Sequence, residues 1–164
     1  MIHDGIDVRA ASAADEAAIV DIDTATWNSL SSPAPRPKDG SPFFTERRRP
    51  EDALVAEVGG LVVGYVVLRQ VIPVPSHRHV LELAGLAVAP DSQRHGVGRR
   101  LVQEAAAEAA RRGAAKLSLR VLGRNPSARR LYESCGFVVE GVLRDEFILD
   151  GRPVDDVLMA RRLT

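Results

Sequence analysis

The sequence predicts an α+β fold, with strands and helices in the order β–α–loop–β–β–β–α–β–α–β–β. Apolar, β-branched runs recur between turn residues, as expected of strands. Two of these turns, Gly59-Gly60 and Asp150-Gly151, are of the kind that joins the strands of a hairpin. Residues 97–112 instead have apolar positions at the 3.6-residue period of a helix. The 164 residues suit one domain spanning 1–164 without an internal repeat.

In the first half of the chain a long loop separates a helix from a hairpin. The predicted elements are a strand at 6–10, a helix running to about residue 27, a loop at 28–50 and strands at 53–58 and 61–72. Ser12 is placed to cap the helix, and Asp15 supplies a weaker form of the capping box. The loop contains five prolines and no sustained periodicity. A loop of this length inside a compact domain is typical of a functional or a disordered segment.

In the second half, strands and helices alternate before a closing hairpin. The predicted elements are a strand at 79–89, a helix at 97–112, a strand at 116–122, a short helix after Asn125, and strands at 137–147 and 154–161. Glu108 and Arg112 form a favourable i,i+4 pair, and Gly113 is placed to end the first of these helices. Asn125 as N-cap and Pro126 at the first position open the second.

Charge and composition narrow the function classes. The chain has 22 basic and 22 acidic residues and 4% aromatic residues, so neither a basic field nor stacking platforms for nucleic acid are expected. The single cysteine, Cys135, excludes an internal disulfide and suits a reducing compartment. No apolar stretch reaches the about 18 residues that a membrane span needs. We therefore expect a cytoplasmic protein with neither a nucleic-acid nor a membrane partner.

Residues 91–101, DSQRHGVGRRL, place two glycines among arginines where a strand hands over to a helix. Gly96 and Gly98 allow backbone N–H groups to converge on one point, and the helix adds the positive end of its dipole, which suits a phosphate. Leu101 stands where a dinucleotide fingerprint needs a third glycine, and the lysine of a P-loop is absent. The alternative is a plain strand–helix turn with solvated arginines.

Two segments resemble a known family. LAVAPDSQRHGVGRRLV is similar to the acetyl-CoA-binding segment of the Gcn5-related N-acetyltransferases (GNAT), and NPSARRLYESCGF is similar to their second signature. The resemblance implies a GNAT-like central mixed, mostly antiparallel sheet of about six to seven strands flanked by helices. It further implies that two strands splay at a bulge near Gly85 and that acetyl-CoA is the co-substrate. Simple close packing is the alternative explanation of Gly85.

The resemblance also assigns cofactor-binding residues. It implies that the Leu86 N–H polarises the acetyl carbonyl and that the Ala87–Val88 backbone pairs with the pantetheine arm. The turn supplies pyrophosphate contacts, and the second signature supplies a hydrogen bond from Asn125. The full set comprises Leu86, Ala87, Val88, Gln93, Arg94, His95, Gly96, Val97, Gly98, Arg99, Asn125 and Ala128.

Two residues are candidates for proton transfer. Alternation along strand 79–89 places Glu82 as the single charge on a face with Leu86 and Val88, where burial would favour a general base. Some members of the resembled family carry a catalytic Glu at this offset; the alternative is a solvent-facing carboxylate. Tyr132 lies two helical turns after Asn125, and the resemblance makes it the general acid toward the thiolate. Packing in an apolar stripe is the alternative for Tyr132.

These residues predict an acetyl-CoA-dependent N-acetyltransferase that acts by direct attack in a ternary complex. The expected acceptor is a primary amine of a small molecule, of the amine or amino acid type. The alternatives are an acetyltransferase for protein N-termini and a non-catalytic acyl-CoA-binding sensor. No Cys/His cluster has metal-ligand spacing, so no metal is expected. Cys135 completes an apolar stripe rather than forming an acyl-enzyme, and a homodimer is left open.

Overall fold

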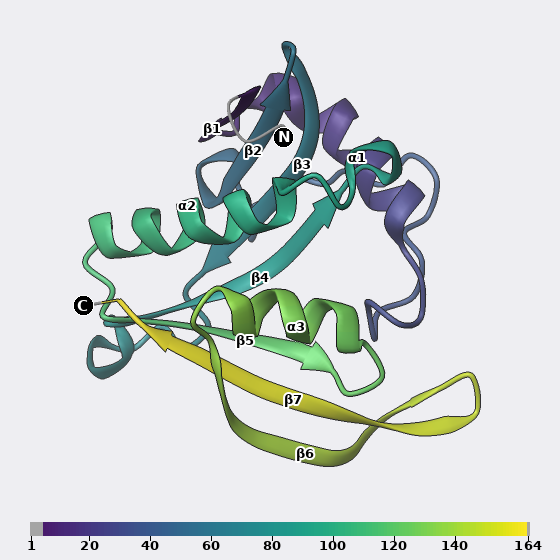
Figure 1. Ribbon diagram of the computed structural model, residues 1–164, viewed down its shortest axis with the longest axis vertical. Helices are drawn as coiled ribbons and strands as arrows, with labels where there is room; N and C mark the ends of the chain where they lie inside the picture. Colours follow the sequence, from purple (N-terminus) through teal and green to yellow (C-terminus); the bar gives the residue numbers. More distant parts are fainter. Residues whose placement is uncertain (1–4, 164) are drawn as a thin grey trace.

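A computed structural model describes residues 5–163 as one seven-stranded sheet with helices on both faces (Figure 1). The strands lie in the order β1-β2-β3-β4-β5-β7-β6. Every neighbouring pair is antiparallel except β4 and β5, which are parallel. The mixed, mostly antiparallel sheet is therefore confirmed. The elements are β1 (Ile6–Ala10), α1 (Glu16–Thr26), β2 (Ala53–Val58), β3 (Leu61–Arg69), β4 (Val80–Val88), α2 (Val97–Arg111), β5 (Lys116–Leu122), α3 (Pro126–Ser134), β6 (Val138–Leu149) and β7 (Arg152–Arg162).

The predicted elements are all present, with differences at their ends. The strand predicted to reach residue 72 stops at Arg69, because the Gln70 side chain donates to the main-chain carbonyls of His77 at 2.9 Å and Val80 at 3.2 Å and organises a turn instead. The last hairpin is longer than predicted, since its turn narrows to Asp150 and Gly151, which have φ of 53° and 72°. The first helix begins with a 3-10 turn, in which the Asp15 carboxylate accepts the Ser12 N–H at 2.8 Å.

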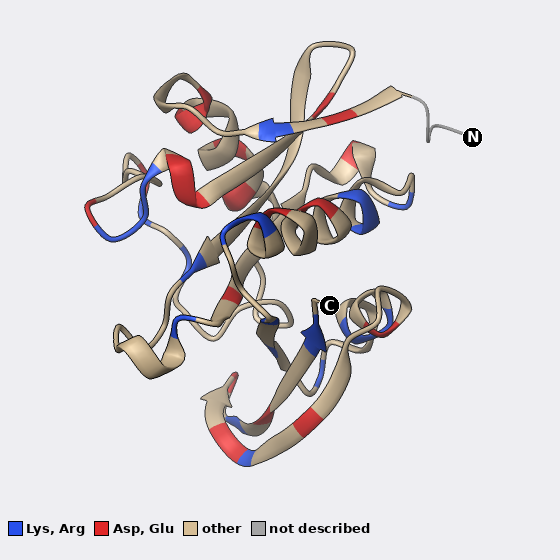
Figure 2. Ribbon diagram, turned by 90° about the vertical axis from the view of Figure 1, so that its left-hand side faces the viewer, with Lys and Arg blue, Asp and Glu red and all other residues tan. Residues whose placement is uncertain are grey.

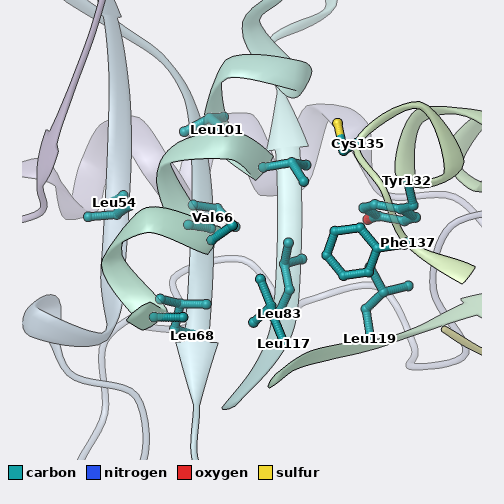
Figure 3. Packing of buried hydrophobic residues seen from close by; sticks show 14 of the residues in the cluster. Leu54, Val66, Leu68, Leu83, Leu101, Leu117, Leu119, Tyr132, Cys135 and Phe137 are labelled. Atoms are coloured by element: carbon teal, nitrogen blue, oxygen red, sulfur yellow. The ribbon is translucent and has the colours of Figure 1, made fainter. Parts of the chain in front are cut away.

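The two faces of the sheet carry separate apolar clusters. On one face, α2 and α3 cover the sheet, and α2 buries the stripe that its sequence period predicts. Figure 3 shows this cluster, with Leu101 from α2 over Val66 and with Tyr132 and Phe137 beside Leu119. On the other face, α1 packs against β3 and β4, in a cluster that also holds Ala53 and Val55 of β2.

Strands β4 and β5 pair along only part of their length. Their parallel register joins Val80–Leu83 to Lys116–Leu119 and goes no further. On its other edge, β4 has a register shift against β3, which leaves Ala84 as an extra residue between Leu83 and Gly85. The predicted splay and bulge are therefore confirmed, and Figure 1 shows β4 and β5 diverging, with α2 over one arm and α3 over the other.

The N-terminus of α2 is seated closely on the sheet at Gly64 of β3. A Cβ on Gly64 would lie 3.0 Å from the Ala87 carbonyl oxygen, 3.0 Å from Leu101 and 3.3 Å from Val97. The first of these atoms belongs to the β3–β4 ladder and cannot move without disturbing it. Gly64 thus sets how closely α2 approaches the strand that carries the candidate site.

We predict that Gly64→Ala lowers the free energy of unfolding by about 1–3 kcal/mol, the cost of overpacking a filled site. Gly141→Ala is the matched control, because a Cβ there would meet nothing nearer than Leu158 at 4.0 Å. Denaturant unfolding of both variants measures the difference. Equal stability of the two variants would show that α2 can shift at no cost.

Candidate active site

A cavity of about 740 Å³ lies on the α1 face, where β4 and β5 diverge. Its walls come from the end of α1, the loop 28–50, the middle of the sheet and the last hairpin. Small residues of β4, among them Ala84, Gly85 and Ala87, line it and leave room. A Cβ on Gly85 would meet only ordinary contacts at 3.9 Å, so close packing does not account for this glycine.

The loop 28–50, predicted from its prolines, forms the outer wall of the cavity and is held at several points. The Glu16 carboxylate accepts the N–H groups of Phe43 and Phe44 at 2.7 and 3.0 Å. The Phe43 ring packs edge-on against Tyr65, with 4.9 Å between centroids. At the other end, Arg124 donates to the Ser29 carbonyl at 2.6 Å and Ser29 donates to Asp150 at 2.8 Å. The last contact ties the loop to the turn of the last hairpin.

Glu82 lies in the cavity wall, but not on the predicted face. The extra residue Ala84 reverses the alternation, so Leu83 and Leu86 both pack toward α2 while Glu82 faces the α1 side. The prediction that Glu82 shares a face with Leu86 and Val88 is therefore wrong. Its side chain is 12% exposed and pairs with the guanidinium of Arg69 at 2.8 Å.

A second buried carboxylate in the cavity wall, Asp156 of β7, was missed by the sequence reasoning. Its side chain is 3% exposed, and its Oδ2 lies 2.9 Å from Nε of Arg120. Burial raises the pKa of Asp156, and the charges of Glu146 and Glu82 add to that rise while Arg120 opposes it. The alternation of side chains along β7 could have revealed this carboxylate. Counting from the apolar Val154, Asp156 lies on the same, buried side of the strand and Asp155 on the outer side.

A third polar contact in this wall joins α1 to β3. The Tyr65 hydroxyl donates to the Asp23 carboxylate at 2.6 Å, and burial with this contact raises the pKa of Tyr65 well above its usual range. Tyr65 is 4% exposed and packs between the loop and the sheet. The pair therefore fixes the inner end of the cavity rather than offering a group that titrates near neutral pH.

The glycine-containing turn lies at the N-terminus of α2, on the opposite face. Gly96 is the N-cap, with φ of 88°, a conformation that side chains rarely adopt. No side chain caps the helix, and its first internal bond runs from the Arg100 N–H to the Gly96 carbonyl. The amides of Val97, Gly98 and Arg99 therefore remain free of helical partners at the positive end of the dipole. This arrangement suits a phosphate, as the sequence predicts.

Some of the other residues in the turn before α2 make contacts within the protein, whereas others are exposed. Gln93 donates through its side chain to the Val88 carbonyl at 3.0 Å, which ties the turn to the end of β4. Arg100 pairs with Glu104 within the helix at 3.1 Å. Arg94 has φ of 62°, and like His95 it is exposed. A Cβ on Gly98 would lie 3.4 Å from Leu131 of α3, so this position faces the space between the two helices.

The open edge of β4 presents backbone groups beside this turn. The Ala89 N–H bonds to the Val63 carbonyl of β3. Because N–H groups alternate between the two edges of a strand, those of Leu86 and Val88 point away from β3, to the edge that β5 has left. The carbonyl polarisation predicted for Leu86 and the pantetheine pairing predicted for Ala87–Val88 both require such an unpaired edge.

Tyr132 and Asn125 come from α3, on the same face as the turn. Tyr132 is 8% exposed, and in Figure 3 its hydroxyl oxygen points from α3 toward β4. Burial raises the pKa of Tyr132 to about 12, so the phenol keeps its proton at neutral pH. Asn125 is the N-cap, and its side-chain oxygen accepts the Ala128 N–H at 3.2 Å, so its amide group is what remains for a ligand. Tyr132 does not line the cavity that holds Glu82.

Charges of both signs alternate over the elements, and Figure 2 shows no large region of one sign in its view. Within residues 5–163, no group of His, Cys, Asp and Glu could hold a metal ion. In the same residues, every helix falls short of the length and apolar character needed to cross a membrane.

The sequence matches the acetyltransferase (GNAT) family over residues 17–137. That range is well over half of the chain and contains the turn, the open edge of β4 and Tyr132. The chain therefore belongs to the GNAT family.

Three similar proteins accompany this match. The chain is 42% identical over 79 residues to the ribosomal protein bS18-alanine N-acetyltransferase of Escherichia coli K12, covering 48% of this chain and 53% of that protein. It is 35% identical over 111 residues to phosphinothricin N-acetyltransferase of Alcaligenes faecalis, covering 67% and 56%. A Salmonella typhimurium protein solved with its cofactor acetyl-CoA has a TM-score of 0.81 at 26% identity, covering 97% and 94%. The chain spans about half the length of the curated relatives it matches.

Proposed function

We propose that this chain is an acetyl-CoA-dependent N-acetyltransferase that acts on a primary amine of a small molecule, by direct attack in a ternary complex. The observation that carries the proposal is the open edge of β4. It lies between the uncapped N-terminus of α2 on one face and the carboxylate-lined cavity on the other. A donor and an acceptor bound on opposite faces can meet at this edge.

The residues around α2 fit acetyl-CoA, which supplies a thioester carbonyl to be attacked and a thiolate that leaves. The amides of Val97, Gly98 and Arg99 are free to bind the pyrophosphate. Arg94 and Arg99 are exposed and can add charge-assisted hydrogen bonds. The Leu86 N–H points into the gap, where it can polarise the carbonyl. The Salmonella typhimurium neighbour with acetyl-CoA supports this assignment.

Two side chains would move protons. Tyr132 holds its proton at neutral pH and can donate it to the departing thiolate. Glu82 lies in the acceptor cavity at the start of the divergence and can take a proton from the incoming ammonium. Direct attack needs no covalent enzyme intermediate, and the buried Cys135 packs with Tyr132 and Phe137 in the core.

The cavity favours a small acceptor. Its volume of about 740 Å³ falls within the range of small-molecule sites. The loop 28–50 walls it and is tied to the last hairpin by Ser29 and Asp150. The Alcaligenes faecalis relative, by its name, acts on phosphinothricin, which is a small molecule. The alternative, a protein N-terminus, is favoured by the Escherichia coli relative, which acts on an alanine of a ribosomal protein.

An amine panel read by release of free thiol from acetyl-CoA tests the proposal. The panel contains the standard amino acids, phosphinothricin, spermidine and a peptide with an N-terminal alanine. Turnover of a small amine above the peptide supports the proposal, and preference for the peptide favours the alternative. Acetyl-CoA binding without turnover of any amine would leave only a sensor function.

We predict that Gly98→Glu abolishes the rise in melting temperature that acetyl-CoA gives, because a carboxylate would enter the space between α2 and α3 beside the phosphate position. Gln103→Glu is the matched control, since it adds the same charge at an exposed position of the same helix. Thermal melts with and without acetyl-CoA provide the measurement. An unchanged rise in Gly98→Glu would contradict the assigned site.

We predict that Tyr132→Phe lowers kcat by ~10²-fold or more, the scale of one general acid. The ring and its packing against Phe137 are kept, so the melting temperature and the KM for acetyl-CoA should change little. Steady-state kinetics separate the two parameters. A variant with normal kcat would make Tyr132 a packing residue.

We predict that Glu82→Gln lowers turnover near neutral pH and that the loss is partly recovered at high pH, where the acceptor is already a free amine. The acidic limb of the pH–rate profile should also move upward, because it then reports the amine itself. The measurement is kcat across pH for both enzymes. An unchanged profile would mean that the proton leaves through water and that Glu82 is only the partner of Arg69.

A further inference from the structure

Asp156 is an unusual group to find in the wall of this cavity. The residue is 2% exposed, and its Oδ2 accepts no hydrogen bond although it is fully buried. The Arg120 Nε lies 2.9 Å from this oxygen, but its N–H is not aligned with it. Buried polar groups are almost always hydrogen-bonded, so an unbonded carboxylate oxygen needs an explanation.

The ion pair with Arg120 does not supply that explanation. The Arg120 side chain is 49% exposed, so water already competes for its charge. Two further carboxylates, Glu82 of β4 and Glu146 of β6, act on Asp156 with the same sign. Glu82 has a guanidinium partner of its own, Arg69 at 2.8 Å, so Asp156 is left with the half-exposed Arg120 alone. Asp156 therefore keeps a buried acceptor atom that no donor in the cavity wall fills.

Asp156 and Glu82 line the same cavity, but they come from strands on opposite sides of the gap between β4 and β5. Glu82 lies on β4 beside Ser118, whereas Asp156 lies on β7 beside Leu122, at the far end of β5. The cavity lining includes both carboxylates and the two arginines that pair with them. An acceptor in the cavity therefore meets Asp156 on the arm away from the start of the divergence.

We propose that Asp156 is the acceptor-binding carboxylate of this cavity, and that its Oδ2 accepts a hydrogen bond from the protonated amine of the substrate. The inference rests on the proposed acetyltransferase function and makes it specific: the acceptor enters as an ammonium ion and is selected as a cation. Asp156 holds the ammonium group, whereas the proton of that group is removed at Glu82. Asp156 therefore governs binding of the acceptor rather than the chemical step.

The test compares Asp156→Asn with Asp155→Asn, using the panel amine that the wild-type enzyme turns over fastest. Asp156→Asn keeps the shape and removes the charge, so KM for that amine should rise about tenfold or more, the scale of a lost charge-assisted hydrogen bond. The values of kcat and of KM for acetyl-CoA should change little. Asp155 pairs with Arg144 on the outer side of the same strand, so its variant should keep the wild-type KM.

The melting temperature of Asp156→Asn provides a second measurement. It distinguishes a carboxylate that binds the acceptor from one that only pairs with Arg120. Asp156 has a raised pKa in the folded protein, so its ionisation opposes folding above its usual pKa and has no effect where it is protonated in both states. Asp156→Asn should therefore melt no lower than the wild type near neutral pH, with any gain vanishing in acid. A residue kept only to pair with Arg120 would instead lose stability on this change.

Arg120→Gln distinguishes the two roles further. It keeps the carboxylate and removes the cation, so KM for the amine should stay level or fall, opposite to the effect of Asp156→Asn. The same rise in KM in both variants, or wild-type kinetics in Asp156→Asn, overturns the inference while leaving the acetyltransferase proposal intact. A wild-type enzyme that turns over no amine of the panel overturns the proposed function and this inference with it.

Discussion

The early end of the pairing between β4 and β5 is the constraint on which both halves of the site depend. The two strands are held together only as far as Leu83 and Leu119. Beyond this point the Leu86 and Val88 N–H groups have no strand partner on that edge. Buried backbone groups without partners are costly, so an edge of this kind is stable only where water or a ligand completes it. The same divergence opens the cavity on the other face.

The extra residue Ala84 decides which side chains line each half. By reversing the alternation it directs Leu83, Leu86 and Val88 into the cluster beneath α2. Small residues, Gly85 and Ala87, are left beside the cavity. One irregularity thus turns the larger side chains of β4 toward the core and leaves small residues beside the cavity. It also explains why Glu82 lies in the cavity wall and not beneath the helices.

The sequence predicted the elements well and the side-chain directions less well. Two glycines between a strand and a periodic helix have few explanations, so the turn and the helix after it could be predicted, and the φ of 88° at Gly96 shows why one of them is needed. Strict alternation failed at β4, because nothing in LELAGLAV distinguishes a bulge from a regular strand except the glycine. Asp156 was missed for a different reason. Two adjacent aspartates look equally solvated until the strand register shows that one of them is buried.

The ion pairs of the cavity share an asymmetry that bears on how an acceptor could bind. The arginine side chains are 56% and 49% exposed, whereas their partners Glu82 and Asp156 are 12% and 3% exposed. A buried charge is costly when it loses its partner, but a half-exposed guanidinium regains water when displaced. A cationic acceptor that hydrogen-bonds to the spare Oδ2 of Asp156, as we propose, therefore leaves no buried charge unpaired. We therefore expect the Asp156 side of the cavity to favour an ammonium group over an anion.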